Sequence, residues 1–343
     1  MSPAQIDWYR VPLPKDQLRS YTEKSSLRGW VQAGSVLLLF AATSTSAFLL
    51  FRAHLWVPMV IVCYLHSFFL HTIGIGGGIH ELSHGTVFRG KRTNDLFFHL
   101  YCFLAWNNPV HFRASHLLHH QYTLYAGQDK EVVQVPVAQK LGLLSWVSAF
   151  TFDYRSFAHM VRVNVLHAVG NANPDFYFWD PLFPEGDPRR KALCRWALFM
   201  VLAYVALTVV LAALGLWVLI YVLVLGSFFG TALARVVTVL QHSGLASSVP
   251  DWRLVCHTMD LNPVLRFFYW QMSFHTEHHM YAAVPFHALP RFSREAAGRM
   301  QAHIPGIRAG VALLRRIRLD QENDPGYVYS PRFPVTADPP RRV

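Results

Sequence analysis

Charged residues and cysteines are both scarce in this chain of 343 residues. Only 15% of the residues are Asp, Glu, Lys or Arg, and 52% are hydrophobic; soluble domains carry roughly 25% charged residues. The four cysteines, Cys63, Cys102, Cys194 and Cys256, lie far apart and form no C-x-x-C unit. A soluble domain, a disulfide framework and a thiolate metal site are therefore disfavoured, and we expect free buried thiols on the reducing side of a membrane.

Three long runs of the sequence contain no charged side chain apart from their edges. A helix needs about 20 apolar residues to cross a bilayer, and residues 30–51 and 55–79 each provide such a run. Residues 197–234 form an uncharged run of 38 residues, which is enough for two crossings with a turn near Gly215. The sequence therefore predicts an all-α integral membrane protein with four transmembrane helices in two hairpins.

The positive charges predict the orientation of these spans. Of the 31 Lys and Arg residues, 5 precede the first span, 12 lie between residues 79 and 196, and 13 follow residue 234. By the positive-inside rule, both termini and the large central segment are expected in the cytoplasm. The net charge of +11 needs no nucleic acid as a partner, because anionic membrane lipid and an acidic redox partner account for it.

The spans divide the chain into six predicted segments. The segments on the cytoplasmic side are expected to form a helical cap that holds a metal site, and the proline- and arginine-rich end is expected to be a mobile tail. In chain order they are an N-terminal cytoplasmic segment (1–29), a first transmembrane hairpin (30–79), a first cap segment (80–195), a second hairpin (196–241), a second cap segment (242–329) and the tail (330–343).

Histidine is frequent, and nine of the 19 histidines follow a pattern on the predicted cytoplasmic side. They occur as HELSH, HLLHH and HTEHH, with one more after the fourth predicted span, and residues three or four apart share one face of a helix. A catalytic zinc takes about three protein ligands, so nine imidazoles indicate two metals, and imidazole suits Fe, Zn, Cu or Ni. The predicted ligands are His80, His84, His116, His119, His120, His242, His275, His278 and His279.

HELSH also matches the H-E-x-x-H motif of zinc metalloproteases, in which Glu81 would activate water. A protease function would not explain HLLHH, HTEHH and His242, so it is a remote alternative. A metal transporter is a second alternative, but it would need polar or charged groups along its spans. Two other histidines, His66 and His71, lie inside a predicted span, where ionisable residues are often functional.

The three histidine motifs resemble the histidine boxes of the membrane-bound fatty-acid desaturase and hydroxylase superfamily. The resemblance extends from about residue 55 to 300 and includes HHQYTLYAGQDKE and EHHMYAAVPFHALPRF. It implies a helical cap under four spans and a non-haem di-iron centre, which uses O2 to remove hydrogen from an unactivated C–H bond. The box histidines would be its ligands, and His242 is similar to the additional ligand of some members. Thr238 stands where some acyl-CoA desaturases have the Asn of an N-x-x-x-H element, which puts a water-mediated ligand in doubt.

Four acids are candidates to orient the imidazoles, because metal-bound histidines usually donate their second N–H to a carboxylate or a carbonyl. Neutral imidazoles leave the charge of the metals uncompensated, which favours a strongly oxidising centre. Among the acids, Asp129 resembles an acidic position that commonly follows the second box. The candidates are Glu81, Asp129, Glu131 and Glu277.

An acyl chain needs an apolar path to the metals, so we expect a tunnel between the spans and the cap. Residues 176–179 (FYFW) and 267–270 (FFYW) are candidates to line it, although aromatic belts at the membrane interface would look the same. Arg113 is a candidate to meet a carboxylate or phosphate head group. GIGGGIH follows no strand, so we interpret it as close helix packing rather than a dinucleotide motif.

Reduction of O2 needs electrons, and the sequence has no haem, iron–sulfur or dinucleotide motif of its own. The resemblance therefore implies a separate carrier such as a ferredoxin, a rubredoxin or a cytochrome b5, with its reductase. A basic patch could dock this carrier or bind the membrane surface, and it comprises Arg308, Arg315, Arg316 and Arg318.

Desaturation of a fatty acyl chain is the reaction that we expect first. Hydroxylation, and oxidative decarboxylation of a free fatty acid to a terminal alkene, remain alternatives at the same metal site. The head group stays open among free acid, CoA ester, carrier-protein ester and intact lipid.

Overall fold

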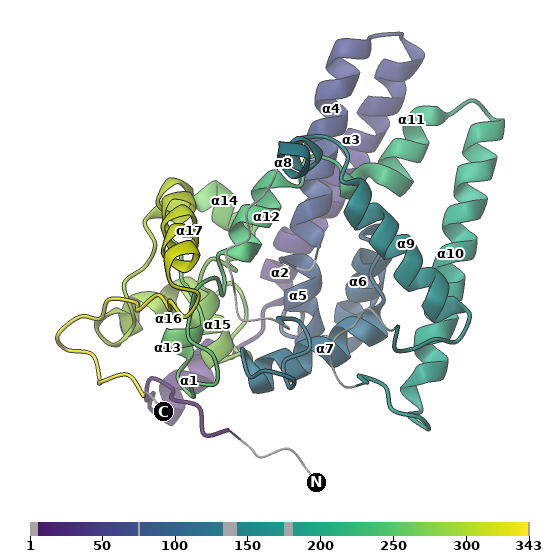
Figure 1. Cartoon of the computed structure of the whole chain (residues 1–343). Helices are drawn as coiled ribbons and strands as arrows, with labels where there is room; N and C mark the ends of the chain where they lie inside the picture. The colour runs from purple at the N-terminus through teal and green to yellow at the C-terminus, as the bar shows by residue number, and fades with distance from the viewer. Residues whose placement is uncertain (1–5, 75, 133–142, 175–180, 342–343) are drawn as a thin grey trace.

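The computed structural model describes residues 6–74, 76–132, 143–174 and 181–341. Within these ranges the secondary structure is helical, with three isolated β-bridges and no strand. The prediction of an all-α fold is confirmed. Figure 1 shows a long helical pair that projects from one end of the molecule and a group of shorter helices at the other end.

Three helices are long and apolar enough to cross a membrane. The first runs from Ser26 to Arg52 as α2 (Ser26–Gly29), a π-helical turn (Trp30–Gly34) and α3 (Ser35–Arg52). The second begins with α4 (Trp56–Ile73), which packs antiparallel to α3 and forms the projecting pair in Figure 1. The third is α10 (Arg189–Ala213). They agree with three of the four predicted spans.

The predicted fourth span is not a continuous helix. After a turn at Gly215 (φ +69°), α11 (Trp217–Ile220), a π-helical turn (Tyr221–Leu225) and a 3-10 turn (Gly226–Phe228) form an apolar segment of only 12 residues. The chain then breaks before α12 (Ala232–Val239). A fourth crossing therefore stays a prediction.

Polar groups from other segments satisfy the backbone at this break. The N–H of Asp153 donates to Phe228 O at 2.7 Å, and the N–H of Gly230 donates to Thr151 O at 3.0 Å. His71 Nε2 contacts the Phe229 carbonyl at 2.7 Å. Broken helices are tolerated at membrane depth only when such partners exist, so His71 has a structural role here.

Shorter helices pack beside the long apolar helices, and we use the word cap for this part of the molecule. α8 (Leu143–Phe150) and α9 (Tyr154–Ala168) flank the broken segment, and α9 packs along α10. The remaining helices are α1 (Lys15–Tyr21), α5 (Gly78–Ser83), α6 (Lys91–Leu104), α7 (Pro109–Tyr122), α13 (Trp252–Val255), α14 (Pro263–Phe268), α15 (His275–Met280), α16 (Leu289–Ala296) and α17 (Gly306–Asn323).

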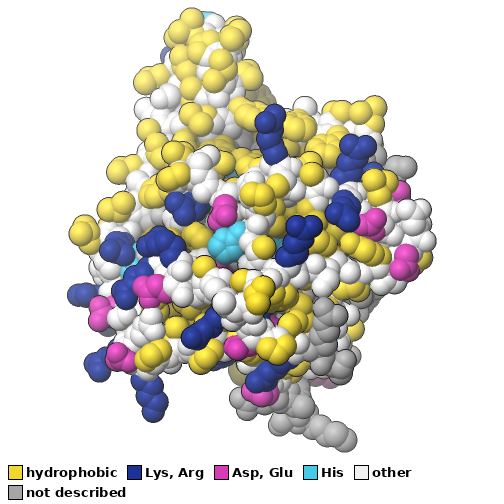
Figure 2. All heavy atoms as spheres, turned by 90° about the vertical axis from the view of Figure 1, so that its left-hand side faces the viewer, with side chains coloured by type: hydrophobic (Ala, Val, Ile, Leu, Met, Phe, Trp, Pro, Cys, Tyr) yellow, Lys and Arg dark blue, Asp and Glu magenta, His cyan; other side chains and the backbone are white. Residues whose placement is uncertain are grey.

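Polar and apolar surfaces are segregated along the long axis of the molecule. Figure 2 shows hydrophobic side chains over the projecting part and most Lys and Arg side chains below it. Leu38 of α3 is 72% exposed and Val57 of α4 is 73% exposed. Large exposed apolar surfaces mark a membrane or an interface, and the length of these helices favours a membrane.

The end of the chain lies against the cap as far as residue 341. The Ala302 N–H donates to Arg332 O at 2.8 Å, and the Tyr9 hydroxyl donates to Asp338 Oδ2 at 2.6 Å. The Arg253 guanidinium donates to Asp338 O at 3.1 Å. These contacts attach the chain end to Tyr9 of the N-terminal segment and to the buried Arg253, and the mobility of residues 330–343 stays a prediction.

Candidate metal centre

Three short helices direct the histidines into the cap. α7 begins at an Asn108 cap, whose side-chain oxygen accepts from the Val110 and His111 N–H groups, with Pro109 in the first helical position. α5 carries the first histidine box, with His84 as its C-terminal cap, and α15 carries the third box. His242 follows α12.

Five histidines from α5, α7 and α15 converge on one point, and their ligand atoms lie within 4.8 Å of one another. The Nε2 atoms of His80 and His278 are 2.8 Å apart, and those of His84 and His116 are 3.0 Å apart. We call this set group one: His80, His84, His116, His120 and His278.

Four further histidines form a second set with the same spacing. The Nε2 atoms of His242 and His275 are 3.0 Å apart, and those of His275 and His279 are 3.1 Å apart. All four side chains are buried. We call this set group two: His119, His242, His275 and His279. The two groups together contain the nine histidines that the sequence predicts.

The hydrogen bonds at the outer ring nitrogens leave the Nε2 lone pairs free to bind a cation. His119 Nδ1 contacts the Asp129 carboxylate at 2.9 Å, His116 Nδ1 contacts Glu131 at 3.1 Å, and His242 Nδ1 contacts Val255 O at 2.8 Å. A neutral imidazole with its proton on Nδ1 has only an acceptor at Nε2. Several acceptors that face one another at about 3 Å repel, unless a cation lies between them.

The spacing also suits metal coordination. A metal–nitrogen distance of about 2.0–2.1 Å with right angles at the metal gives neighbouring nitrogens about 3.0 Å apart. The observed separations are 2.8–3.1 Å. The residues of each group therefore fit one bound transition-metal ion.

Burial keeps most of these imidazoles in the neutral form that binds metal. It lowers the pKa of His242 to about 3 and the pKa of His278 to about 3. His119 differs: burial opposes its charge, but the Asp129 carboxylate raises its pKa. Because ligands must be deprotonated at the binding nitrogen, the lowered pKa values favour metal binding at neutral pH, whereas a metal at group two would have to displace a proton from His119.

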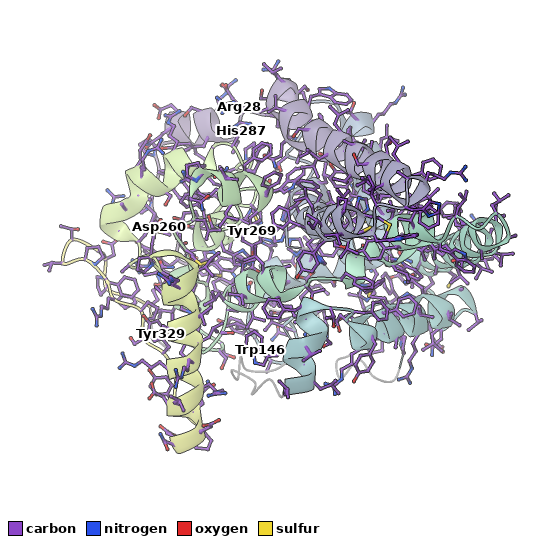
Figure 3. The ribbon with its side chains drawn as sticks, turned by 90° about the horizontal axis from the view of Figure 1, so that it is seen from above. Arg28, Trp146, Asp260, Tyr269, His287 and Tyr329 are labelled. Carbon is purple, nitrogen blue, oxygen red and sulfur yellow. The ribbon has the colours of Figure 1, made fainter. Side chains whose placement is uncertain are left out.

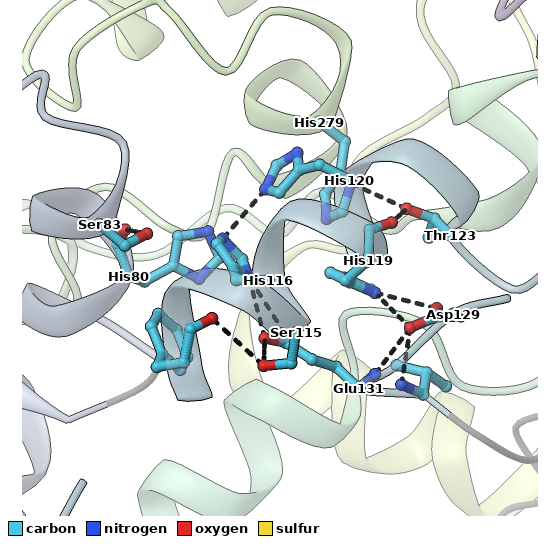
Figure 4. A network of polar contacts seen from close by, with 12 residues as sticks. His80, Ser83, Ser115, His116, His119, His120, Thr123, Asp129, Glu131 and His279 are labelled. Atoms are coloured by element: carbon cyan, nitrogen blue, oxygen red, sulfur yellow. Dashed lines mark hydrogen bonds and ion pairs between the residues drawn. The ribbon is translucent and has the colours of Figure 1, made fainter. Parts of the chain in front are cut away.

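Three of the four predicted acids lie beside ligand histidines, as Figure 4 shows for Asp129 and Glu131. Asp129 is buried and also accepts from the N–H groups of Leu124 and Glu131 at 2.9 and 2.8 Å. Glu81 Oε1 lies 3.3 Å from His278 Nδ1. Asp129 and Glu131 therefore fix imidazole rings from outside the two groups, whereas Glu81 lies beside a ring without a hydrogen bond to it.

The fourth predicted acid has a different role. Glu277 accepts from the hydroxyls of Thr258 and Ser293 at 2.6 and 2.5 Å, and it lies 3.6 Å from His303. These contacts hold α15, and thereby the third box, against the cap. Sequence reasoning missed Thr123, whose hydroxyl lies 3.2 Å from His279 Nδ1.

Comparison with known proteins agrees with this geometry. The family model described as Fatty acid desaturase matches residues 54–310. The chain belongs to the fatty acid desaturase family. The match confirms the resemblance stated above, and the matched range contains all nine histidines of the two groups. No curated protein sequence matches the chain.

This member of the desaturase family has a cavity of about 210 Å³ between the apolar helices and the cap. Its walls come from α4, the broken segment, α12 and α14, and they include Phe68, Leu70, Leu233, Val237, Leu265 and Phe268. Phe268 and Tyr269 belong to the aromatic run at residues 267–270. The other predicted run, residues 176–179, lies outside the described residues.

One side of the cavity approaches group two. Gly76, Thr238 and Tyr269 line it there, and Thr238 stands one helical turn before His242. A side chain at Gly76 would begin 3.0 Å from Thr238 Oγ1 and 3.5 Å from the Tyr269 ring. Tyr269 lies near the centre of the molecule when it is viewed from above (Figure 3). A glycine therefore keeps this side of the cavity open.

Arg113 lies outside this cavity. Its guanidinium pairs with Asp95 and stacks over the Phe98 ring, with 4.3 Å between the guanidinium carbon and the ring centre. It borders a separate surface hollow with His99 and Arg189. A head group that reaches Arg113 would therefore have to approach from that hollow.

Proposed function

We propose that this protein is an O2-dependent di-iron oxidoreductase that acts on an unactivated C–H bond of a fatty acid or fatty acyl chain. The observation that carries this proposal is the pair of histidine groups beside an apolar cavity. Group one would hold one iron ion and group two the other. Two irons in an all-imidazole environment supply the oxidising power needed to remove hydrogen from an alkyl chain.

The protein's own residues would bind and orient the reactants. The apolar walls of the cavity accept an alkyl chain and exclude water, because they offer it few hydrogen-bond partners. Gly76, Thr238 and Tyr269 line the side of the cavity where the alkyl chain would approach the histidines. Asp129 and Glu131 keep the protons of His119 and His116 on Nδ1, away from the metal side.

Desaturation is the reaction that we favour within this class. Hydroxylation, and decarboxylation of a free fatty acid to a terminal alkene, use the same metal groups and differ in which hydrogen the cavity presents. The residues that line the cavity include no Asp, Glu, Lys or Arg. This supports an alkyl chain as the part of the substrate that reacts.

A zinc protease is disfavoured by the surroundings of Glu81. Its Oε2 accepts from the Phe286 N–H at 3.2 Å and from Thr86 Oγ1 at 3.3 Å, while Oε1 lies beside His278. A general base needs access to a water molecule on the metal. The carboxylate of Glu81 is fully buried and faces the outside of group one.

We further propose that the metal groups and both termini face the cytoplasm, as the distribution of Lys and Arg indicates. Membrane lipid would surround α3, α4 and α10. The electrons would come from a separate ferredoxin, rubredoxin or cytochrome b5 with its reductase.

Metal content of the detergent-purified protein tests this function directly. Plasma mass spectrometry should find about two irons per chain in the wild type and much less in His278→Ala. His99→Ala is a matched control, because His99 lies on α6 and its Nδ1 contacts Asp95 O at 2.7 Å. One zinc per chain, unchanged in His278→Ala, would contradict the proposal. Products from a panel of fatty acids would then separate desaturation, hydroxylation and decarboxylation.

A further inference from the structure

A stack of aromatic rings connects the surface of the cap with group two. Trp252 is buried, with 1% of its surface exposed, and its ring centre lies 5.2 Å from that of His279. Trp8 stacks on Trp252: the two ring centres are 3.7 Å apart, and the planes differ by 9°. Trp8 is partly exposed. Three rings therefore lead from solvent to a predicted metal ligand.

The segment that carries Trp8 is held firmly in place. The Tyr9 N–H donates to Pro250 O at 2.8 Å, and Tyr9 forms a β-bridge with Asp251. Trp8 Nε1 donates to the Gln121 carbonyl at 3.0 Å, next to the ligand His120. These bonds attach the N-terminal segment to both α13 and α7, so the ring stack has a defined geometry.

Exposed arginines surround this segment. Arg10 lies over the Tyr281 ring, Arg299 donates to Pro12 O at 3.2 Å, and Arg341 donates to Asp7 at 3.0 Å. Asp7 and Asp338, whose carboxylate accepts from the Tyr9 hydroxyl, offset two of the three charges. In Figure 1 the N-terminal segment lies at the end of the molecule opposite the turn between α3 and α4. A soluble protein can therefore approach it without contact with a membrane around the spans.

We propose that the Trp8–Trp252 stack is the entry path for electrons, and that the basic surface around Trp8 docks a small acidic one-electron carrier with an iron–sulfur or haem group. This inference rests on the proposed di-iron function. With iron held by His119, His242, His275 and His279, one electron would leave the reduced carrier, which becomes oxidised, and would be accepted by that iron. The indole rings shorten the gaps through which the electron tunnels and are neither oxidised nor reduced themselves.

This surface differs from the α17 patch that the sequence suggests. On α17, Arg316 lies 3.7 Å from Asp320 and Arg318 lies 3.8 Å from Glu322, so acids offset part of the positive charge. The ring contact with His279 favours the surface around Trp8. Rates of carrier-driven reduction distinguish the two surfaces.

Stopped-flow reduction of the iron-loaded protein tests the proposal. Chemically reduced [2Fe–2S] ferredoxin, rubredoxin and cytochrome b5 are used in turn, and oxidation of the carrier is followed by absorbance. Trp8→Leu should lower the limiting rate at saturating carrier strongly, and Trp8→Phe should restore part of it. Arg10→Glu should instead slow association and reduce its dependence on salt. Trp146→Leu is the control, since Trp146 is an exposed tryptophan on α8 (Figure 3).

Two measurements separate the possible outcomes. Reduction by dithionite, a small reductant that needs no docking, should be equally fast in the wild type and Trp8→Leu, and iron content and thermal stability should match. An unchanged limiting rate in Trp8→Leu would overturn the electron path. Failure of all three carriers with a wild type that dithionite reduces would overturn the docking surface. If the wild type holds no reducible iron, the proposed function itself is wrong.

Discussion

The two histidine groups differ in size, burial and support. Group one has five imidazoles, of which His84 and His120 are partly exposed, whereas the four imidazoles of group two are all buried. The Nδ1 atoms of group one contact Glu131 and lie beside Glu81. Those of group two contact Asp129, the Thr123 hydroxyl and the Val255 carbonyl. Both groups follow a residue of the cavity wall in the chain: Thr238 stands four residues before His242 of group two, and Gly76 stands four residues before His80 of group one.

The histidines of a single box can belong to different groups. In the second box, His116 and His120, four residues apart, belong to group one, and His119 belongs to group two. In the third box the pair four apart, His275 and His279, belongs to group two instead. The second and third boxes therefore each contribute to both groups, whereas the first box contributes only to group one. Group two has fewer imidazoles, so we expect it to depend more on each of its ligands.

Loss of a ligand from group two should have the largest effect. His275→Ala leaves three imidazoles there, whereas His84→Ala leaves four in group one. We expect His275→Ala to lose its metal and all turnover, and His84→Ala to retain more metal. Changes to mere orienting partners already cost roughly 10–100-fold in affinity or activity. Plasma mass spectrometry and product analysis check this, and equal metal loss in both variants would contradict the asymmetry.

The orienting acids provide the next comparison. Asp129→Asn replaces a buried carboxylate that accepts from His119 and from backbone N–H groups, so its amide would place a donor against a donor. We expect a loss of metal affinity of roughly 10–100-fold. Glu131→Gln should cost less, because Glu131 has 26% of its side chain exposed and water can replace it. Chelator titration of the loaded variants measures both effects.

A methyl group at Gly76 would narrow the side of the cavity that Thr238 and Tyr269 line. Gly76→Ala would bring a carbon to 3.0 Å from Thr238 Oγ1. We expect kcat/KM for the best fatty acyl substrate to fall by about tenfold, the lower end of what one methylene costs in a tight apolar site, with unchanged iron content.

Gly90→Ala is the matched control for this change. A carbon at Gly90 meets only Thr93 Oγ1, at 3.5 Å. Equal kinetics in the two variants would show that the cavity side at Gly76 does not guide the substrate.

The smallest effect concerns α15, which supplies both groups. Burial opposes the charge of His303, but contacts with Glu277 and Asp260 raise its pKa to about 9. A raised pKa in the folded state stabilises the protein below pH ~6.5, and this stability is lost as pH rises toward 9. The total is at most about 3.4 kcal/mol, because the pKa rises from 6.5 to about 9 at 1.36 kcal/mol per pKa unit.

Thermal unfolding across this pH range checks the prediction. The unfolding midpoint of the wild type should fall between pH 6.5 and 9 relative to that of His303→Gln. Parallel curves for the two proteins would mean that the ion pair with Glu277 contributes nothing to the support of α15.

Much of the fold and the site follows from local sequence patterns. Uncharged runs predicted the three long apolar helices, because hydrophobic length is a local property. The i, i+3, i+4 spacing predicted that each box presents its imidazoles on one helical face. The spacing could not show that the pair four residues apart in the second box, His116 and His120, belongs to group one, whereas the corresponding pair in the third box, His275 and His279, belongs to group two. This assignment depends on how α7 and α15 face each other.

The break in the predicted fourth span could not be predicted from the local sequence pattern. Residues 217–234 read as a continuous apolar helix, yet the backbone breaks where the Thr151 carbonyl accepts from the Gly230 N–H and the Asp153 N–H donates to Phe228 O. Those partners lie about 80 residues away in the chain, since Asp153 bonds across to Phe228. A local pattern cannot register such distant partners.

By itself the sequence determined an all-helical chain with long apolar helices and nine histidines of metal-binding type, since side-chain hydrophobicity and helical periodicity act over a few residues. Only the tertiary structure decided how these histidines divide into two groups, which acids hold them, where the cavity lies, and that Trp8 reaches toward His279 through Trp252. These features depend on contacts between residues far apart in the chain, and packing of the whole molecule sets those contacts.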